Sequence, residues 1–373
     1  MNDGIQVAKI WNIPIRLHIS WFIIFALVAW TLASGYFPAQ APDLSKAQYL
    51  VVGALTSLLF GASVLAHELG HSFVALRNKV RVSRVTLFIF GGIAQIEEEP
   101  PTPRAEFWIA IAGPLTSLAL GLGFGALGLL AGPLAWLSAP SLWLARINLV
   151  LAAFNLIPGF PLDGGRVLRA IVWQVKKDLK KATQIASTAG RVVAIGFIAY
   201  GVFIALTGDF FNGLWIAFIG WFLQNAAAGA VTQMEVQETL KGVEVSQIMQ
   251  RDVQSIPWST RLDSVVEERV IPFGSQVFLV TDQHGLALRG MLTLGNVTAV
   301  PRDRWAHLTA QDVMVPRNRF VSVRPEMEVL DALRFMDESH VSQVPVMDDD
   351  DLIGVLTQED VMRYLRLWSK LKH

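Results

Sequence analysis

The sequence has no cysteine among its 373 residues, which excludes disulfide bonds and thiolate metal sites. Charge is also scarce: 17% of the residues are Asp, Glu, Lys or Arg, against about 25% in an ordinary soluble domain. Hydrophobic residues make up 53% of the chain, and the formal net charge is zero. These values exclude a disordered chain and a protein that binds nucleic acid through bulk positive charge, and they argue against a purely soluble enzyme.

Apolar runs are abundant before residue 232, and six of them are candidates for membrane-spanning helices. A spanning helix needs about 20 mostly apolar residues. The last two runs are separated by only Thr207–Asp209, which indicates a tight helical hairpin. We therefore expect an α-helical polytopic membrane domain over residues 1–235. The six runs are Leu17–Phe37, Tyr49–Leu76, Phe107–Leu130, Leu134–Ile157, Val192–Leu206 and Phe210–Ala230.

Lys and Arg in the loops predict the orientation of these spans. If the N-terminus is cytoplasmic, the two inner loops carry twelve Lys and Arg residues and the outer loops carry one, Lys46. Positively charged loops stay on the cytoplasmic side of a membrane. We therefore expect a multi-pass protein of the cell membrane with both termini in the cytoplasm.

Charged residues become frequent after about residue 232. Residues 1–235 contain 16 basic and 11 acidic residues, whereas residues 236–373 contain 15 basic and 20 acidic ones. The zero net charge is therefore a cancellation between a basic membrane segment and an acidic, cytoplasmic one.

This second segment contains a repeat with a period of about 64 residues. Val245–Met249 recurs as Ala310–Met314, and Gly290–Thr293 recurs as Gly354–Thr357. Short β-rich runs at 277–280 and 343–346 lie between these signals. Repeated strand and helix signals predict a soluble α/β module built twice, with copies at about 243–300 and 308–368.

The second apolar run contains His67-Glu68-Leu69-Gly70-His71, an H-E-x-x-H pattern. On a helix, two histidines four residues apart share a face and can bind one zinc ion, while the glutamate beside them can act as a general base. Charged groups inside a membrane cost free energy and are functional by default. The alternative is a pair of interior histidines that bond to neighbouring helices, with Glu68 as their counter-charge.

Zinc in a catalytic site takes a third protein ligand. Asp163 is the best candidate, because it lies in a proline- and glycine-rich break, Asn155–Arg166, at the cytoplasmic end of the fourth span. Irregular backbone at membrane depth is tolerated around a watery cavity. The alternative is an ordinary helix-stop loop with a capping aspartate. Glu106, beside Arg104, is predicted to be an interfacial charge instead.

Together, H-E-x-x-H and the Asn155-x-x-Pro158…Leu162-Asp163-Gly164 stretch resemble the site-2 protease family of intramembrane zinc metalloproteases. The stretches Phe90–Ala94 and Ala112–Leu115 support the resemblance. The duplicated module resembles a CBS-domain pair, which is typical of one branch of that family.

The resemblance implies a role for each motif residue. His67, His71 and Asp163 would bind one zinc ion, and Glu68 would be the catalytic base and then the proton donor. Asn155 would contact the substrate backbone or the developing oxyanion; its alternative is a hydrogen bond in helix packing.

The resemblance also implies a partner and a way to present it. Residues 81–96 would form a re-entrant β-hairpin that pairs with an extended substrate strand, although a cytoplasmic hairpin with no catalytic role would have the same pattern. Substrates would be single-span membrane proteins in the lipid bilayer, such as anti-sigma or pro-sigma factors.

For the CBS pair, the resemblance implies an adenine nucleotide such as ATP. Thr357 and Asp360 match the nucleotide-binding pattern in the second copy. Thr293 matches it in the first copy, where Asn296 replaces the aspartate, so one site is expected rather than two. The alternative is a pair that serves only for docking or for homo-oligomer formation.

The sequence is consistent with two functions from different classes. The first is an intramembrane zinc endopeptidase with a nucleotide-responsive CBS pair. The second is a CBS-regulated transporter or channel, whose ionisable residues should be spaced along a permeation path rather than gathered in one cluster.

Overall fold

A computed structural model describes residues 4–89, 91–96, 99–274, 276–285 and 287–371. Phe90, quoted above, lies outside the described residues. The chain divides into two compact units, Met1–Gln233 and Met234–His373.

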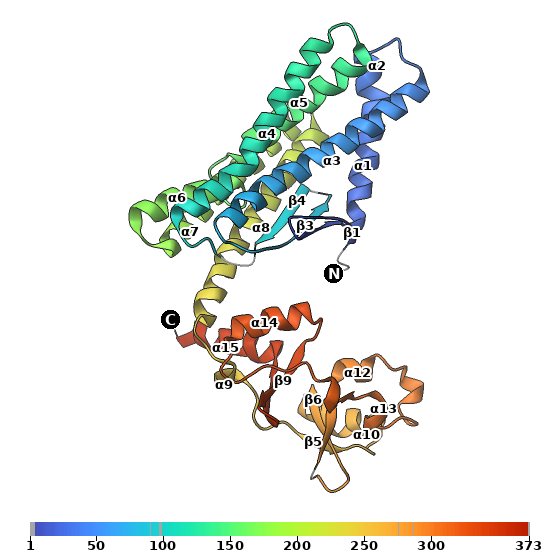
Figure 1. The fold of residues 1–373 in the computed structure, drawn as a ribbon, viewed down its shortest axis with the longest axis vertical. Coiled ribbons are helices and arrows are strands. Elements are labelled where there is room, and N and C mark those ends of the chain that lie inside the picture. Colours follow the sequence, from blue (N-terminus) through green and yellow to red (C-terminus); the bar gives the residue numbers. More distant parts are fainter. Residues whose placement is uncertain (1–3, 90, 97–98, 275, 286, 372–373) are drawn as a thin grey trace. The chain divides into compact units, whose positions relative to one another are not determined.

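The first unit confirms the prediction of a polytopic helical domain, because six of its described helical segments are long and apolar enough to cross a membrane. The first segment, α1 (Ile19–Thr31), continues through a π-helical turn (Leu32–Tyr36) into α2 (Phe37–Gln40). The other five, shown in Figure 1, are α3 (Lys46–Arg77), α4 (Pro103–Ala131), α5 (Ala135–Asn155), α7 (Leu179–Leu206) and α8 (Phe210–Leu240).

Polar residues at the helix ends set where the spans begin. Ser45 starts α3 with a capping box, in which its own N–H donates to Gln48 Oε1 over 2.8 Å. Thr102 caps α4, which has Pro103 in its first turn. Asp178 caps α7. Such residues satisfy N–H groups that have no partner inside the helix.

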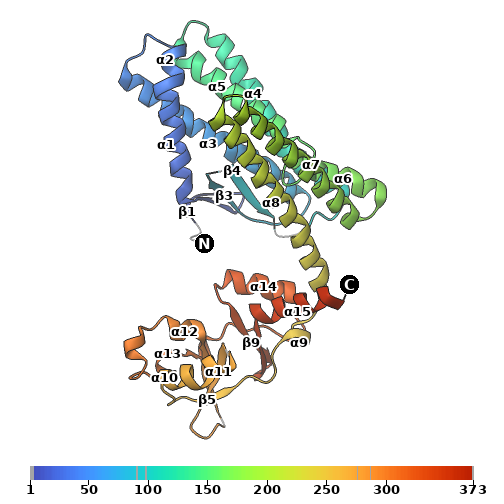
Figure 2. The ribbon, with the colours of Figure 1, turned by 180° about the vertical axis from the view of Figure 1, so that it is seen from behind.

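The tight hairpin expected near residue 208 is formed by α7 and α8, which lie side by side in Figure 2. Ala194 of α7 and Leu223 of α8 belong to one buried cluster, together with Leu162 from the loop before α6.

The predicted β-hairpin is present as β3 (Val82–Phe88) and β4 (Gly91–Ile96). The sheet is larger than predicted, because β1 (Ile5–Ile10) and β2 (Ile13–Leu17) extend it in the order β1-β2-β3-β4. The parallel pairing of β2 with β3 joins segments about seventy residues apart, such as Ile15 with Val85. No local pattern reveals such a pairing. The sheet leaves β4 at one edge.

One helix of this unit was not predicted. α6 (Asp163–Lys176) follows the proline- and glycine-rich break and precedes α7. It is amphipathic: Arg169 and Ala170 are buried, while Ile171 and Val175 are exposed. Asp163 is therefore the first residue of a helix rather than part of an irregular loop.

The second unit confirms the α/β fold and has two hydrophobic cores, each of which draws residues from both copies, such as Ala310 in the first core and Val245 in the second. Phe278 and Leu292 lie in the first core, and Val344 and Leu356 in the second. The strands are β5 (Ser255–Pro257), β6 (Val277–Thr281), β7 (Leu288–Thr293) and β8 (Val315–Pro316) in one sheet, and β9 (Gln343–Asp348) and β10 (Asp351–Thr357) in the other. The helices are α9 (Val245–Ile248), α10 (Leu262–Val265), α11 (Ile271–Phe273), α12 (Leu294–Thr298), α13 (Ala310–Val313), α14 (Val329–Glu338) and α15 (Gln358–Leu371).

Candidate active site

The two histidines of the H-E-x-x-H motif lie on α3. Because they are four residues apart, both imidazoles leave the helix on one face. His67 and His71 are each 4% exposed, so this face points into the protein and not toward lipid. The helix thus delivers two nitrogen ligands to the interior of the membrane unit.

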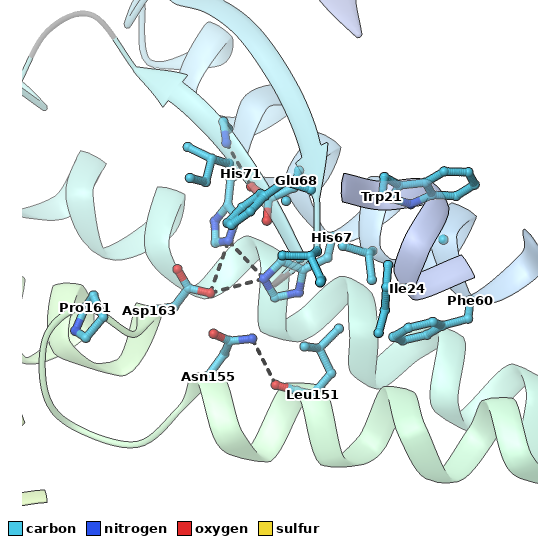
Figure 3. Close-up of a pocket in the computed structure, with 18 of the residues that line it drawn as sticks. Trp21, Ile24, Phe60, His67, Glu68, His71, Leu151, Asn155, Pro161 and Asp163 are labelled. Atoms are coloured by element: carbon cyan, nitrogen blue, oxygen red, sulfur yellow. Dashed lines mark hydrogen bonds and ion pairs between the residues drawn. The ribbon is translucent and has the colours of Figure 1, made fainter. Parts of the chain in front are cut away.

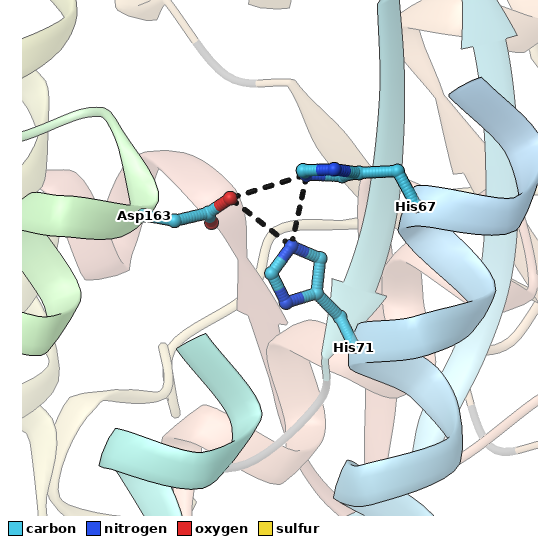
Figure 4. Close-up of side chains that lie close together, drawn as sticks. All are labelled: His67, His71 and Asp163. Atoms are coloured by element: carbon cyan, nitrogen blue, oxygen red, sulfur yellow. Dashed lines mark hydrogen bonds and ion pairs between the residues drawn. The ribbon is translucent and has the colours of Figure 1, made fainter. Parts of the chain in front are cut away.

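Asp163 meets these imidazoles from the start of α6, as Figure 4 shows. Its Oδ2 atom lies 3.2 Å from Nε2 of His67 and 3.2 Å from Nε2 of His71, and the two Nε2 atoms are 3.2 Å apart. Zinc bonds of about 2.0–2.1 Å in a tetrahedron separate neighbouring ligand atoms by about 3.3–3.4 Å. The spacing of the triangle therefore suits three ligands that would hold one zinc ion.

The other nitrogen of each imidazole is held by α4. Nδ1 of His71 lies 2.6 Å from the carbonyl oxygen of Ile109, and Nδ1 of His67 lies 2.8 Å from Oγ of Ser117. A carbonyl oxygen only accepts, so Nδ1 of His71 donates, and Nε2 of the neutral ring keeps its lone pair. Metal-binding histidines are held in this way. The donor set fits zinc.

Gly113 of α4 provides the space in which the ligand atoms meet. A Cβ added to Gly113 would lie 2.1 Å from Nε2 of His71 and 2.6 Å from Nε2 of His67. Both distances are far below a carbon–nitrogen van der Waals contact. This close approach explains the glycine of the Ala112–Leu115 stretch, because any side chain there would occupy the metal position.

Glu68 lies against the edge strand of the sheet. Its Oε2 atom accepts a hydrogen bond from the backbone N–H of Ala94 in β4, over 3.1 Å. A Cβ added to Gly92 would lie 2.4 Å from Cγ of Glu68, so the glycine makes room for this glutamate. The sequence did not reveal the contact, which ties the hairpin to the site.

The Asp163 carboxyl is buried with the imidazoles around it. Burial alone would raise the pKa of Asp163, but the neighbouring imidazoles of His71 and His67 outweigh burial and hold that pKa below its ordinary value. The carboxyl is therefore ionised, which is the form that binds metal.

Glu106 differs from the prediction. Instead of an interfacial charge, its side chain is fully buried in α4 and pairs with Arg169 of α6. Nε of Arg169 donates to Oε1 of Glu106 over 2.5 Å, and Nη2 contacts the same oxygen. Glu106 and its partner are 63 residues apart in the sequence. The nearby Arg104 therefore did not reveal which arginine pairs with Glu106. The ion pair joins α4, which holds the imidazoles, to α6, which carries Asp163.

A cavity of about 450 Å³ lies beside the three ligand atoms (Figure 3). It is lined by residues of α1, α3, β4 and the end of α5, and Asn155 is among them. The Nδ2 atom of Asn155 donates to the carbonyl oxygen of Leu151 over 3.1 Å. The structure thus shows a hydrogen bond within α5, which agrees with the alternative role of Asn155 in helix packing. Contact between Asn155 and the substrate stays a prediction.

In the second unit, Thr357 and Asp360 are bonded to their own protein. The hydroxyl of Thr357 donates to Oδ2 of Asp360 over 2.6 Å. Oδ1 of Asp360 accepts from Nε2 of Gln250 over 2.7 Å and also pairs with Arg363. Thr357 is 6% exposed and Asp360 is 1% exposed. Their predicted role in binding nucleotide stays a prediction, and it would require these bonds to open.

Thr293 of the first copy lies at a cavity instead. This cavity, of about 570 Å³, is lined by Thr293 and Asn296 from the first copy and by His340, Ser342 and Gln343 from the second. Thr293 and Asn296 form the same capping pattern, with the Thr293 hydroxyl 2.7 Å from Oδ1 of Asn296. Replacement of aspartate by asparagine therefore leaves the local geometry of the first copy intact.

Comparison with protein families supports both halves of this description. Residues 55–133 and 130–197 match the model of peptidase family M50. Residues 310–367 match the CBS-domain model, which corresponds to the second copy of the repeat.

Several relatives align with nearly the whole chain. A Synechocystis sp. protein, provisionally named a zinc metalloprotease, is 34% identical over 98% of this chain and 96% of its own length. A zinc metalloprotease of Methanocaldococcus jannaschii is 28% identical over 98% of this chain and 97% of its own length. A solved site-2 protease from M. jannaschii is 30% identical, covers 61% of this chain and 95% of its own, and superposes with a TM-score of 0.41.

We predict that Gly113→Ala removes zinc without unfolding the protein. The methyl group would occupy the space between the ligand nitrogens, so zinc affinity should fall by about 10- to 100-fold or more, the range seen when the surroundings of a metal site change. Gly123→Ala is the matched control, because a Cβ on Gly123, on the same helix, meets nothing within 4 Å. Zinc content of the purified proteins measures the effect; equal zinc in both variants would contradict the proposed metal position.

We also predict that Arg169→Ala destabilises the membrane unit. Removing one partner of a buried ion pair costs about 3–5 kcal/mol, because the other charge stays buried and unpaired. Equilibrium unfolding in mixed micelles measures this change. Arg191→Ala, which removes an exposed arginine of α7, should change stability by less than about 1 kcal/mol. Similar effects of the two substitutions would show that the Glu106–Arg169 pair does not join α4 to α6 as described.

Proposed function

Because the chain belongs to peptidase family M50, the site-2 zinc metalloproteases, and ends in a CBS domain, we propose that it cleaves single-span regulatory membrane proteins. Cleavage would fall in or near their transmembrane segments. The observation that carries this proposal is the triangle of His67, His71 and Asp163 with Glu68 beside it, buried in the membrane unit and adjoining a cavity.

The clustering of ionisable groups favours this function over a transporter. Among the residues described in the spanning helices, the buried ionisable groups are the two histidines at the metal site, with Glu68 next to them, and Glu106, which is paired with Arg169. A permeation path would need such groups at intervals across the membrane. A single compact cluster of ionisable groups is what a hydrolytic active site requires.

The edge of β4 supports a model for how the substrate is presented. The N–H of Ala94 points away from β3, because it bonds to Glu68. Backbone groups two residues away point to the same side of a strand, so Gly92 and Ile96 also face this edge. An extended peptide could add to it through main-chain hydrogen bonds. Since Gly92, Ala94 and Ile96 all line the cavity, the added strand would run beside Glu68.

Each site residue has a role in this proposal. When bound, zinc supplies a Lewis acid that activates water and polarises the scissile carbonyl. Glu68 takes the proton from the attacking water at its carboxylate and then gives it to the leaving amine. The hydrogen bond from Ala94 holds the Glu68 side chain next to the substrate strand. Asn155, which lines the cavity, would donate its remaining amide N–H to the substrate carbonyl.

We expect Glu68→Gln to keep zinc and the fold but to lose cleavage. The amide retains the shape of the side chain and cannot accept a proton, and loss of a general base typically costs about 10²–10⁴-fold in rate. The assay uses single-span substrates in proteoliposomes, with zinc content and unfolding as controls. Activity within a factor of a few of the native rate, at full zinc occupancy, would overturn the mechanism.

For the second unit, we propose that an adenine nucleotide regulates the protease from the cavity at Thr293. This placement differs from the expectation at Thr357, because Thr357 and Asp360 are buried and Gln250 and Arg363 engage Asp360, whereas Thr293 lines a cavity. The proposed orientation, with both termini in the cytoplasm, gives this cavity access to cellular ATP. The same unit is also the proposed surface for homo-oligomer formation.

We predict that Thr293→Val weakens AMP or ATP binding to the full-length protein by about three- to tenfold, which is the effect of losing one hydrogen bond. Thr357→Val is the matched control, since it removes the equivalent cap from the second copy and should lower stability by about 1 kcal/mol without reducing nucleotide affinity. Isothermal titration in detergent gives both affinities. If Thr357→Val weakened nucleotide binding and Thr293→Val did not, the nucleotide site would lie at Thr357 and Asp360 instead.

A further inference from the structure

The turn from α6 into α7 (Figure 2) has a feature that proteolysis does not use. A groove of about 640 Å³ lies between the end of α6, the first turns of α7 and the loop that contains Pro158. Lys176, Lys181 and Gln184 line it together with apolar side chains such as Ile185 and Val193. The groove is therefore both cationic and apolar.

The residues along α7 show how the cationic and the apolar parts of the groove are arranged. Lys181, Ile185, Thr188, Val192 and Ile195 follow one another at spacings of four, three, four and three, so they form one stripe on the helix. Val192 is 65% exposed and Ile195 is 55% exposed. In a membrane-spanning helix, an exposed apolar stripe of this kind faces lipid. The stripe begins at the cationic residue and becomes fully apolar farther along the span.

Charge around the turn is strongly positive. Lys176, Lys177, Lys180 and Lys181 lie within six residues, and Asp178 is the one carboxylate between residues 164 and 208. Asp178 Oδ2 lies 3.1 Å from Nζ of Lys181. Both groups are substantially exposed, and exposed pairs of this kind are weak. An incoming anion can therefore exchange with Asp178 at Lys181.

We propose that this groove binds a phospholipid with an anionic headgroup. The phosphate would lie between Lys176 and Lys181, and an acyl chain would follow Ile185, Val192 and Ile195 along α7. Charge complementarity at one end and an exposed apolar stripe at the other fit one amphiphile of this kind. Basic pockets between helices near a membrane surface are suited to acidic headgroups. A small soluble phosphate would use the lysines but leave the apolar stripe uncovered.

The experiment measures lipid retained by the full-length protein. The protein is reconstituted in vesicles of phosphatidylcholine and phosphatidylglycerol, extracted gently, and examined by native mass spectrometry. Native protein should retain phosphatidylglycerol in preference to phosphatidylcholine. The double substitution Lys176→Gln and Lys181→Gln should reduce its apparent affinity by about tenfold to thirtyfold, from the contribution of two lysines near an anionic surface.

Two further variants separate a specific site from general attraction to a charged membrane. Lys9→Gln with Lys79→Gln removes the same charge from exposed positions of the same unit outside the groove, and it should retain the lipid. Thr188→Trp fills the groove while both lysines remain, and it should lose the lipid. Equal retention by all variants, equal retention of phosphatidylcholine, or displacement of the lipid by millimolar glycerol phosphate would each overturn the proposal.

Discussion

The structure depends on bringing three electron-pair donors together inside a membrane unit. The Nε2 atoms of His67 and His71 and the Oδ2 atom of Asp163 are each 3.2 Å from one another. In an interior of low polarity, such atoms repel one another unless a cation lies between them. The chain has no cysteine, so histidine nitrogen and carboxylate oxygen are the ligands it can offer to zinc. Most features of the unit serve to hold this arrangement.

Three structural elements hold it from different sides. α4 fixes the imidazoles through Ile109 and Ser117, and it approaches them closely because position 113 is glycine. α6 supplies Asp163 and is tied to α4 by the buried pair of Glu106 and Arg169. β4 holds the Glu68 carboxylate beside the metal position. The sheet edge and the base therefore occupy the same wall of the cavity, so that a bound strand and the reacting groups would meet there.

Features that arise from local sequence could be predicted. Apolar runs gave the six spans, helical spacing put His67 and His71 on one face, and the repeat revealed the two copies of the second unit. Features that arise from tertiary packing could not be predicted. The pairing of β2 with β3 and that of Glu106 with Arg169 each join residues more than sixty positions apart. Likewise, Thr357 and Asp360 match a binding pattern, but only the fold shows that Gln250 and Arg363 already engage that aspartate.

The central claim is that these two histidines and Asp163 hold one zinc ion. X-ray absorption at the zinc edge of the purified full-length protein tests it most directly. The account predicts a first shell of nitrogen and oxygen with two imidazoles, and loss of the ion or of its carboxylate oxygen in Asp163→Asn. A native spectrum with sulfur or with one imidazole, or an unchanged spectrum at full occupancy in Asp163→Asn, would contradict it.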